Sequence, residues 1–256
     1  MIITLPQIEV FLLILARISG LFSTAPLFSA RSIPSLGKTA IIIWITALMW
    51  FVIPVSNFPS STISFFLAVL TEATLGIILG FAVNIIFIAV QAAGELIDLQ
   101  MGLSVAQSFD PIFGANISIV GRFILTMALT LFVIFNGHHM LLSIIHQSFR
   151  LIPLGGSINI TSPKFLSEII SLGTILWSIA IQLAGPIILI IFLSDFAFGI
   201  VSRVAPQVNV FMLGFQVKPA LGLVGILFIL PIMTKYIGGL LAVMAEEALK
   251  ILGALR

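Results

Sequence analysis

Long apolar stretches separated by short polar ones dominate the pattern of this chain. Six stretches have helical length, and they lie at residues 8–28, 39–55, 63–93, 117–142, 166–201 and 217–245. About 20 apolar residues in a helix cross the hydrocarbon core of a bilayer, so each stretch is typical of a membrane-spanning helix. The pattern predicts an all-α integral membrane protein with about six hydrophobic helices arranged as hairpins.

Two of these stretches, 63–93 and 166–201, are longer than a straight crossing requires. At 1.5 Å per residue they would extend roughly 45 to 54 Å, whereas the hydrocarbon core is about 30 Å thick. Residues that can bend helices occur in the long stretches and in the last one, namely Gly76 and Gly80, Gly185-Pro186, and Pro231. We therefore expect kinked helices rather than straight rods.

Composition supports a membrane protein and narrows the classes of partner. Hydrophobic residues make up 60% of the chain and charged residues 8%, against about 25% charged in an ordinary soluble domain. A length of 256 residues suits one domain, 1–256, in contact with membrane lipid. The net charge of +2 is too small to indicate a nucleic-acid surface. Cysteine is absent, which excludes disulfides and thiolate chemistry.

The loop charges do not predict which way the chain crosses the membrane. Lysines and arginines normally gather in the cytoplasmic loops. Here one side receives Arg31, Lys38, Arg203 and Lys218, and the other receives Arg150, Lys164, Lys250 and Arg256. The two sides are equal, which is compatible with a protein whose final place depends on its partners.

A polar, glycine-containing stretch from Gly94 to Arg122 separates two of the most apolar segments. A connection of this length is rare unless it is functional or disordered, and this one is too apolar to remain solvated. Non-helical backbone at membrane depth needs protein around it or a water-filled cavity beside it. We therefore expect a buried, non-helical loop between the third and fourth helices, inside an assembly or a pore.

Among the ionisable residues in the apolar stretches, we single out four as intramembrane charges: Arg17, Glu72, Arg122 and Glu168. A charge at membrane depth indicates by default a pairing or a pathway. A structural ion pair of Glu72 with Arg17 or Arg122 is the favoured interpretation. A proton or ion relay and contacts with other subunits are the alternatives.

The connection at 203–218 is unusually apolar for the turn of the last hairpin. Its side chains need cover from protein or from the membrane interface. They either pack on their own helices or form a docking surface for a partner. The residues assigned to this partner-binding loop are Arg203, Pro206, Gln207, Asn209, Phe211, Met212, Gly214, Phe215 and Lys218.

No catalytic, cofactor or metal site is predicted. The chain has no nucleophile elbow, zinc-protease motif or phosphate-binding loop. His138, His139 and His146 raise a metal site as one interpretation, but adjacent histidines on a helix point about 100° apart, and a polar helix end is favoured. We expect a protein that is not an enzyme. A secondary transporter or ion channel is the alternative, with Gly185-Pro186 and Pro231 as its broken-helix positions.

Two stretches, GELIDLQMGLSVAQSFDP and SDFAFGIVSRVAPQVNVFMLGFQVKPALGL, resemble the FliR family of flagellar biosynthesis proteins, which has a counterpart in virulence type III secretion. The second is the more specific, with the pattern R-x-x-P-Q-x-N-V-F followed by G-F-x-x-K. The resemblance covers nearly the whole chain, including its length and its six apolar stretches. One departure is Gln216, where the family usually has proline.

The resemblance implies a subunit of an export gate in the bacterial inner membrane, at the flagellar basal body. Its partners would be FliP and FliQ, with residues 1–160 similar to FliP and the hairpin at 161–256 similar to FliQ. The export-switch protein FlhB would dock on the 203–218 loop, and unfolded flagellar proteins would pass through the gate. The family's gate is similar to a cone raised largely above the bilayer, toward the periplasm.

The resemblance also implies that a loop at about 102–116 obstructs the lumen of the closed gate. Independently, an apolar constriction excludes water, and glycines at both ends provide backbone freedom. A static structural loop is the alternative. The plug residues are Met101, Gly102, Phe109, Asp110, Pro111, Ile112, Phe113 and Gly114.

Overall fold

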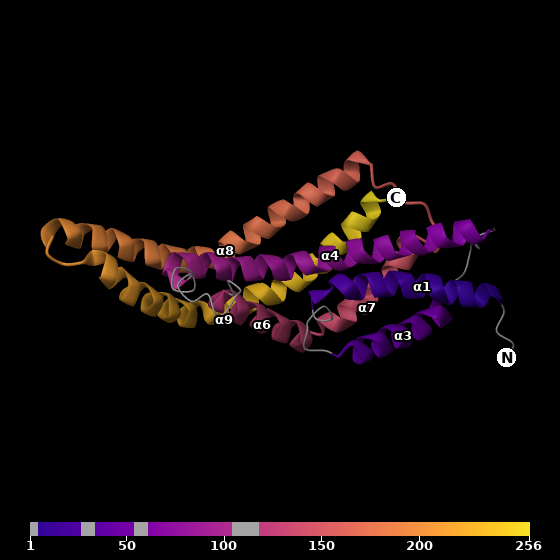
Figure 1. Cartoon of the computed structure of the whole chain (residues 1–256), viewed down its shortest axis with the longest axis horizontal. Coiled ribbons are helices and arrows are strands. Elements are labelled where there is room, and N and C mark those ends of the chain that lie inside the picture. The colour runs from indigo at the N-terminus through magenta and orange to yellow at the C-terminus, as the bar shows by residue number, and fades with distance from the viewer. Residues whose placement is uncertain (1–4, 27–33, 54–60, 104–117) are drawn as a thin grey trace. The chain divides into compact units, whose positions relative to one another are not determined.

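The computed structural model describes residues 5–26, 34–53, 61–103 and 118–256 (Figure 1). Every regular element in these ranges is a helix. The helices are α1 (Leu5–Thr24), α3 (Ser35–Val52), α4 (Thr62–Met101), α6 (Ile119–Ile134), α7 (Gly137–Leu151), α8 (Pro163–Val204) and α9 (Val210–Ala254). The predicted all-α fold class is confirmed.

Five of the described helices are long and apolar enough to cross a membrane: α1 from Pro6 onward, α3, α4, α8 and α9. Helices α6 and α7 meet the same criterion only as a pair, which brings the number to six. The prediction of about six membrane helices is confirmed, and the chain is an integral membrane protein.

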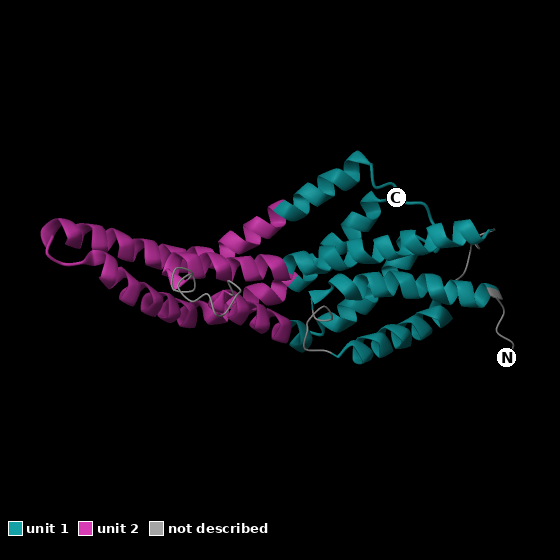
Figure 2. Cartoon of the chain, viewed as in Figure 1, with its two compact units in different colours: residues 1–86, 132–173, 241–256 teal, residues 87–131, 174–240 magenta. Residues whose placement is uncertain are grey.

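The described residues form two compact units (Figure 2). Unit 1 contains residues Met1–Ile86, Phe132–Gly173 and Leu241–Arg256, and unit 2 contains Phe87–Leu131 and Thr174–Leu240. The chain passes from one unit to the other within α4, α6, α8 and α9, so each unit combines segments that are far apart in the sequence. The predicted division into parts 1–160 and 161–256 stays a prediction.

Glycines allow α1 and α4 to approach closely in unit 1. A Cβ atom added to Gly76 would overlap the carbonyl oxygen of Arg17, and one added to Gly20 would overlap the α4 backbone. A Cβ atom added to Gly80 would overlap the carbonyl oxygen of Leu21. Gly76 and Gly80 thus do not interrupt α4, which is continuous from Thr62 to Met101. They permit the small-residue packing that brings membrane helices together.

Helix α4 continues beyond the predicted end of the third stretch at residue 93. Ala93, Ile97 and Met101 recur every four residues and are all fully buried, so one apolar face extends to the end of the helix. The expectation that the non-helical stretch begins at Gly94 is therefore wrong. The connection between α4 and α6 comprises 102–118, of which 104–117 lie outside the described residues.

The predicted fourth helix, 117–142, is wrong as a single element. Helix α6 ends at Ile134, α7 begins at Gly137, and the two are bent by 73° at this break. Asn136 has a φ of 57°, a left-handed conformation that asparagine tolerates better than most residues and that cannot continue a right-handed helix. Helix α7 buries one face, which includes Leu141, Ile144 and Ile145, and exposes polar residues on the other.

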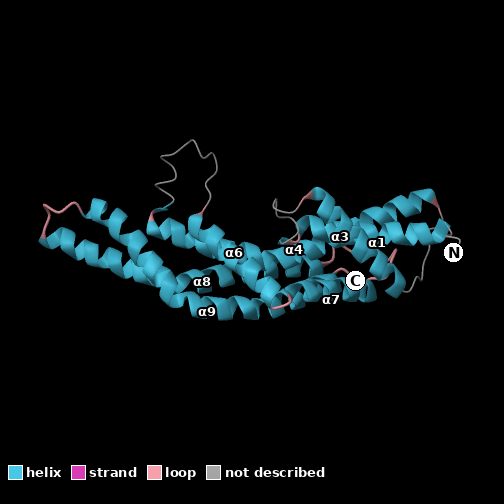
Figure 3. Cartoon of the chain, turned by 90° about the horizontal axis from the view of Figure 1, so that it is seen from below, coloured by secondary structure: helices cyan, strands magenta, loops and turns pink. Residues whose placement is uncertain are grey.

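The turn of the last hairpin is shorter than predicted (Figure 3). Helix α8 ends at Val204 and α9 begins at Val210, so 205–209 form the turn rather than 203–218. The side-chain oxygen of Asn209 accepts a hydrogen bond from the backbone N–H of Met212, at 3.2 Å. This is an N-cap interaction, which starts the helix immediately after Asn209 and makes the following apolar residues helical.

Candidate functional site

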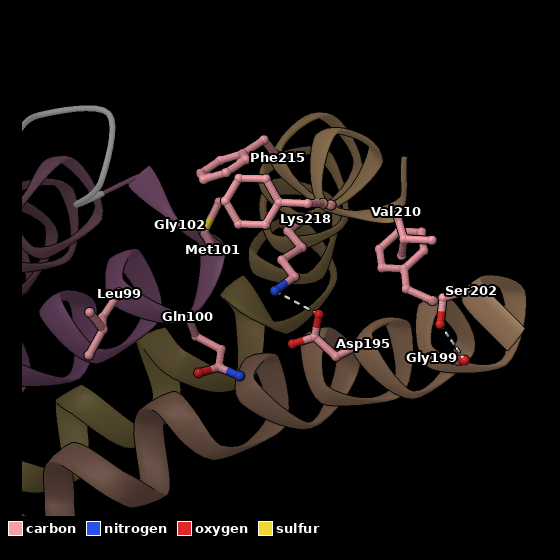
Figure 4. A pocket seen from close by; sticks show the side chains of 13 residues that line it. Leu99, Gln100, Met101, Gly102, Asp195, Gly199, Ser202, Val210, Phe215 and Lys218 are labelled. Atoms are coloured by element: carbon pink, nitrogen blue, oxygen red, sulfur yellow. Dashed lines mark hydrogen bonds and ion pairs between the residues drawn. The ribbon is translucent and has the colours of Figure 1, made fainter. Parts of the chain in front are cut away.

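A groove lies in unit 2 beside the turn of the last hairpin (Figure 4). It encloses about 530 Å³ and is bordered by the end of α4, the last part of α8 and the first part of α9. The lining residues are Leu99, Gln100, Met101 and Gly102 from the α4 end, Asp195, Phe198, Gly199 and Ser202 from α8, and Val210, Phe211, Gly214, Phe215 and Lys218 from α9.

Helical spacing explains why these residues share one groove. On α8 the lining positions are 195, 198, 199 and 202, and on α9 they include 211, 214, 215 and 218. Both sets follow the spacing i, i+3, i+4, i+7, which places residues on one face of a helix. The 205–209 turn joins the two helices, so their lining faces border the same space.

An ion pair crosses the groove from α9 to α8. The Lys218 Nζ lies 2.6 Å from the Asp195 Oδ1, and both side chains are partly exposed (Figure 4). A partly exposed pair of this kind contributes about 1 kcal/mol or less to stability. The ion pair also places one positive and one negative group on the largely apolar surface of the groove.

Two phenylalanines form the aromatic side of the groove. The rings of Phe211 and Phe215 meet edge to face with centroids 4.8 Å apart, and the Phe211 side chain is 73% exposed. Gly102 has a φ of 79°, and a Cβ atom on it would lie 3.6 Å from a ring carbon of Phe215. The residue that follows α4 therefore lies against the aromatic side of α9 (Figure 4). Exposed aromatic side chains such as Phe211 are common anchors in binding sites.

Of the predicted plug residues, only Met101 and Gly102 lie in the described ranges. Met101 is fully buried in α4, and a Cβ atom on Gly222 of α9 would lie 2.6 Å from its sulfur. It therefore fills the packing between two helices of unit 2, a different environment from the expected loop. Phe109, Asp110, Pro111, Ile112, Phe113 and Gly114 lie outside the described residues.

The structure brings part of the predicted partner-binding loop together with the start of the predicted plug. Phe211, Gly214, Phe215 and Lys218 line the groove beside Met101 and Gly102. The other members of that loop lie around it. Arg203, Pro206, Gln207 and Met212 are exposed, and Asn209 caps α9.

Arg17 and Glu72 form a buried ion pair in unit 1. The Arg17 Nε lies 2.5 Å from the Glu72 Oε2, and each side chain is 1% exposed. The other nitrogens of Arg17 donate to the Ser148 hydroxyl at 3.3 Å and to the Ile152 carbonyl at 3.0 Å. The guanidinium also lies 4.1 Å from the centre of the Phe149 ring. One arginine thus connects α1, α4 and the end of α7. The second oxygen of Glu72 accepts a hydrogen bond from the Gly155 N–H, at 3.1 Å, so both oxygens of this carboxylate have a partner.

The other two predicted intramembrane charges have a different environment. Arg122 is exposed and Glu168 is partly exposed. Neither side chain has an ion pair within the described parts of the chain. They are available for contacts outside this chain.

Sequence reasoning missed the role of two acidic residues. Asp195 lies within the apolar stretch 166–201 but was not among the four intramembrane charges, although Lys218 follows it just across the turn. Asp98 was noted only as part of the polar stretch, yet it is 1% exposed and accepts hydrogen bonds from Ser118 and Val120. An acidic residue next to an apolar face was the available signal in both cases.

The described residues contain no cluster of three or more histidine, aspartate or glutamate side chains arranged to hold a metal ion. What unit 2 offers is a largely apolar groove with one ion pair, on helices whose outer faces carry exposed apolar side chains. Taken together, these observations define a polytopic helical membrane protein with a largely apolar groove near the turn of its last hairpin.

Comparison with known proteins gives the family. The profile of the bacterial export proteins, family 1, matches residues 8–244. The chain is 36% identical over 217 residues to the flagellar biosynthetic protein FliR of Bacillus subtilis (strain 168), covering 84% of this chain and 83% of that one. It is 34% identical over 223 residues to FliR of Escherichia coli (strain K12), covering 87% and 84%.

A relative with a different name matches over a shorter range. The surface presentation of antigens protein SpaR of Shigella flexneri is 30% identical over 152 residues, covering 59% of this chain and 58% of SpaR. The chain belongs to the bacterial export proteins, family 1, the family of FliR. The resemblance noted in the sequence is confirmed.

Proposed function

We propose that this chain is a structural and gating subunit of the flagellar type III protein export apparatus. With FliP and FliQ it forms the channel through which unfolded flagellar proteins cross the bacterial inner membrane. The observation that carries this proposal is the match to bacterial export proteins over residues 8–244, together with FliR relatives that align over more than four fifths of the chain. The chain serves as a subunit of an assembly and not as an enzyme.

Helix length and exposed apolar faces support assembly with partner helices. Helices α8 and α9 contain 42 and 45 residues, which corresponds to roughly 63 and 68 Å, about twice the hydrocarbon core. Large apolar side chains remain exposed along α8 from Trp177 to Val204. Lipid covers only part of such a length, so FliP and FliQ helices cover the rest. This also supports an assembled gate raised toward the periplasm at the flagellar basal body.

The groove beside the last turn is proposed to bind FlhB. Its exposed Phe211 supplies an aromatic anchor, and the Asp195–Lys218 pair supplies one acceptor and one donor for orientation. The predicted plug at 102–116 begins at the same groove, because Gly102 lies against Phe215. A partner in the groove therefore binds next to the point where the proposed plug leaves α4.

Copurification from the native membrane in mild detergent tests the proposal. A tagged full-length chain should recover FliP and FliQ in a stable complex, and expression without these partners should give an aggregated or degraded chain. A monodisperse, stable monomer that binds a solute or an ion by itself would instead favour a secondary transporter or ion channel.

A further inference from the structure

Asp98 is a buried carboxylate that joins two helices of unit 2. It lies in the last turn of α4 and is 1% exposed. The Ser118 hydroxyl donates a hydrogen bond to its Oδ2 at 2.5 Å, and the Val120 backbone N–H donates to the same oxygen at 3.2 Å. Ser118 in turn accepts a hydrogen bond from the Gly121 N–H at 2.7 Å. Asp98 and Ser118 thus accept hydrogen bonds from two N–H groups in the first turn of α6, those of Val120 and Gly121.

No described lysine, arginine or histidine forms an ion pair with Asp98. Its negative charge is instead directed at the N-terminus of α6, where free N–H groups and the helix dipole stabilise an anion. The nearest basic residue in the sequence, Arg122, has an exposed side chain. Removing the carboxylate would leave buried N–H and hydroxyl donors without an acceptor, which is strongly unfavourable in an apolar environment.

A second contact holds the same two helices at the neighbouring turn. A Cβ atom on Gly94 would overlap the backbone of Gly121, so α4 and α6 touch there without side chains between them. Gly94 lies one helical turn before Asp98 on α4. The polar and the glycine contact together define the relative position of the α4 end and the α6 start.

We propose that Asp98 is a positioning residue, which clamps the N-terminus of α6 to α4 and keeps these helix ends together while the gate operates. The consequence for gating rests on the proposed function. The end of the connection at Ser118 is held by buried hydrogen bonds. At the other end, Gly102 has a positive φ, donates its N–H to the Leu99 carbonyl at 3.1 Å, and lies beside the groove. The clamp therefore keeps the start of α6 beside Asp98, which lies four residues before Gly102 and the groove on α4.

A disulfide between the two clamp positions tests whether the helix ends stay together. The chain contains no cysteine, so Asp98→Cys with Ser118→Cys introduces the only two thiols. Their side chains contact each other in the structure, and oxidation should link them in the full FliP–FliQ complex. We expect the oxidised complex to export flagellar proteins as well as the reduced one. Export that stops on oxidation and returns on reduction would overturn the proposal. Cysteine is one atom shorter than aspartate, so if no disulfide forms the side-chain variants decide.

Side-chain variants test whether the carboxylate itself does the positioning. Asp98→Ala should leave assembly with FliP and FliQ intact but raise ion leak roughly tenfold, because charge-assisted hydrogen bonds are lost. Asp98→Ser with Ser118→Asp restores an acid–hydroxyl pair and should return leak to the natural level, which a packing defect alone would not allow. Glu95→Gln is the matched control, since Glu95 lies on the same helix, is exposed and accepts a hydrogen bond from the Gln91 side chain.

These outcomes separate the clamp from the proposed function. If the natural chain does not copurify with FliP and FliQ, the export-gate assignment is contradicted. Formation of the disulfide between positions 98 and 118 would still support the clamp in that case. If ion leak stays at the natural level both in Asp98→Ala and in the double variant Asp98→Ser with Ser118→Asp, the positioning role is overturned. If Asp98→Ala fails to assemble, the clamp is tested by the disulfide variant instead, because the disulfide keeps positions 98 and 118 joined.

Discussion

The guanidinium of Arg17 on α1 and the carboxylate of Glu72 on α4 pair at 2.5 Å, and both side chains are 1% exposed. Every charged oxygen of Glu72 and each of the three nitrogens of Arg17 has a partner, through Ser148, Ile152 and Gly155. An arginine within the membrane-like core of unit 1 is thus fully satisfied. This pair therefore holds together segments that are far apart in the sequence.

Breaking this pair should destabilise unit 1 strongly. Arg17→Ala or Glu72→Ala alone leaves one buried charge without its counterion, and we expect a loss of about 3 to 5 kcal/mol in the free energy of unfolding. Replacing both, as Arg17→Met with Glu72→Leu, should cost much less. Thermal unfolding of the purified complex measures this. Arg122→Ala is the control, since Arg122 is exposed; single variants as stable as that control would contradict the prediction.

Close packing of α1 on α4 should depend on Gly76. In Gly76→Ala the new methyl group meets the Arg17 carbonyl, so α1 must move away, and we expect a loss of roughly 1 to 3 kcal/mol. Gly173→Ala has open space around the new methyl group and should be neutral or stabilising by up to about 1 kcal/mol. In the same detergent, Gly76→Ala should lower the unfolding temperature, whereas Gly173→Ala should leave it unchanged or raise it. Equal shifts would show that the glycine contact is not tight.

The groove should be where the partner FlhB docks. A cysteine placed at Phe211 or Met212 should crosslink to FlhB in assembled membranes, whereas one at Phe228 on the same helix, exposed but outside the groove, should not. Phe211→Asp should weaken the association by roughly 30-fold, since a buried aromatic anchor contributes on the order of 2 kcal/mol. Crosslinks confined to the chain's own helices would remove this assignment.

The stretch at 102–116 should act as a plug. Deleting residues 106–113, which lie outside the described residues, and reconnecting the chain should allow assembly with FliP and FliQ but make the membrane leaky to ions or small molecules. Leak is measured as the loss of membrane potential in cells with the variant gate. If the deleted form assembles and the membrane stays as tight as with the natural chain, the stretch is a static structural loop.

Helix boundaries differ from the sequence prediction where local patterns and tertiary contacts compete. Hydropathy placed a helix end at residue 93, because Gly94, Glu95 and Asp98 are poor candidates for a lipid-facing surface. In the structure the same residues have specific partners, with Gly94 against Gly121 and Asp98 at the start of α6. The helix therefore continues to Met101. A polar residue in a helix is unfavourable only until a neighbouring element satisfies it.

At the turn of the last hairpin the sequence did contain a local signal for a helix start, the N-cap residue Asn209, but the prediction gave more weight to the apolar residues that follow it. Asn209 is an N-cap residue followed directly by helical residues. Reading the apolar residues after it as part of a loop extended the turn to Lys218. Once they are helical, Phe211, Gly214, Phe215 and Lys218 lie on one face, and that face lines the groove.

The amino-acid sequence by itself determined that this is a helical membrane protein, how many apolar segments it has, and which family it belongs to. These properties depend on composition, periodicity and motifs, which are local along the chain. Only the tertiary structure decided that Arg17, and not Arg122, pairs with Glu72, and that Gly102 meets Phe215. Such pairings join residues more than 50 positions apart, and their energy depends on burial and distance, quantities that exist only once the helices have packed.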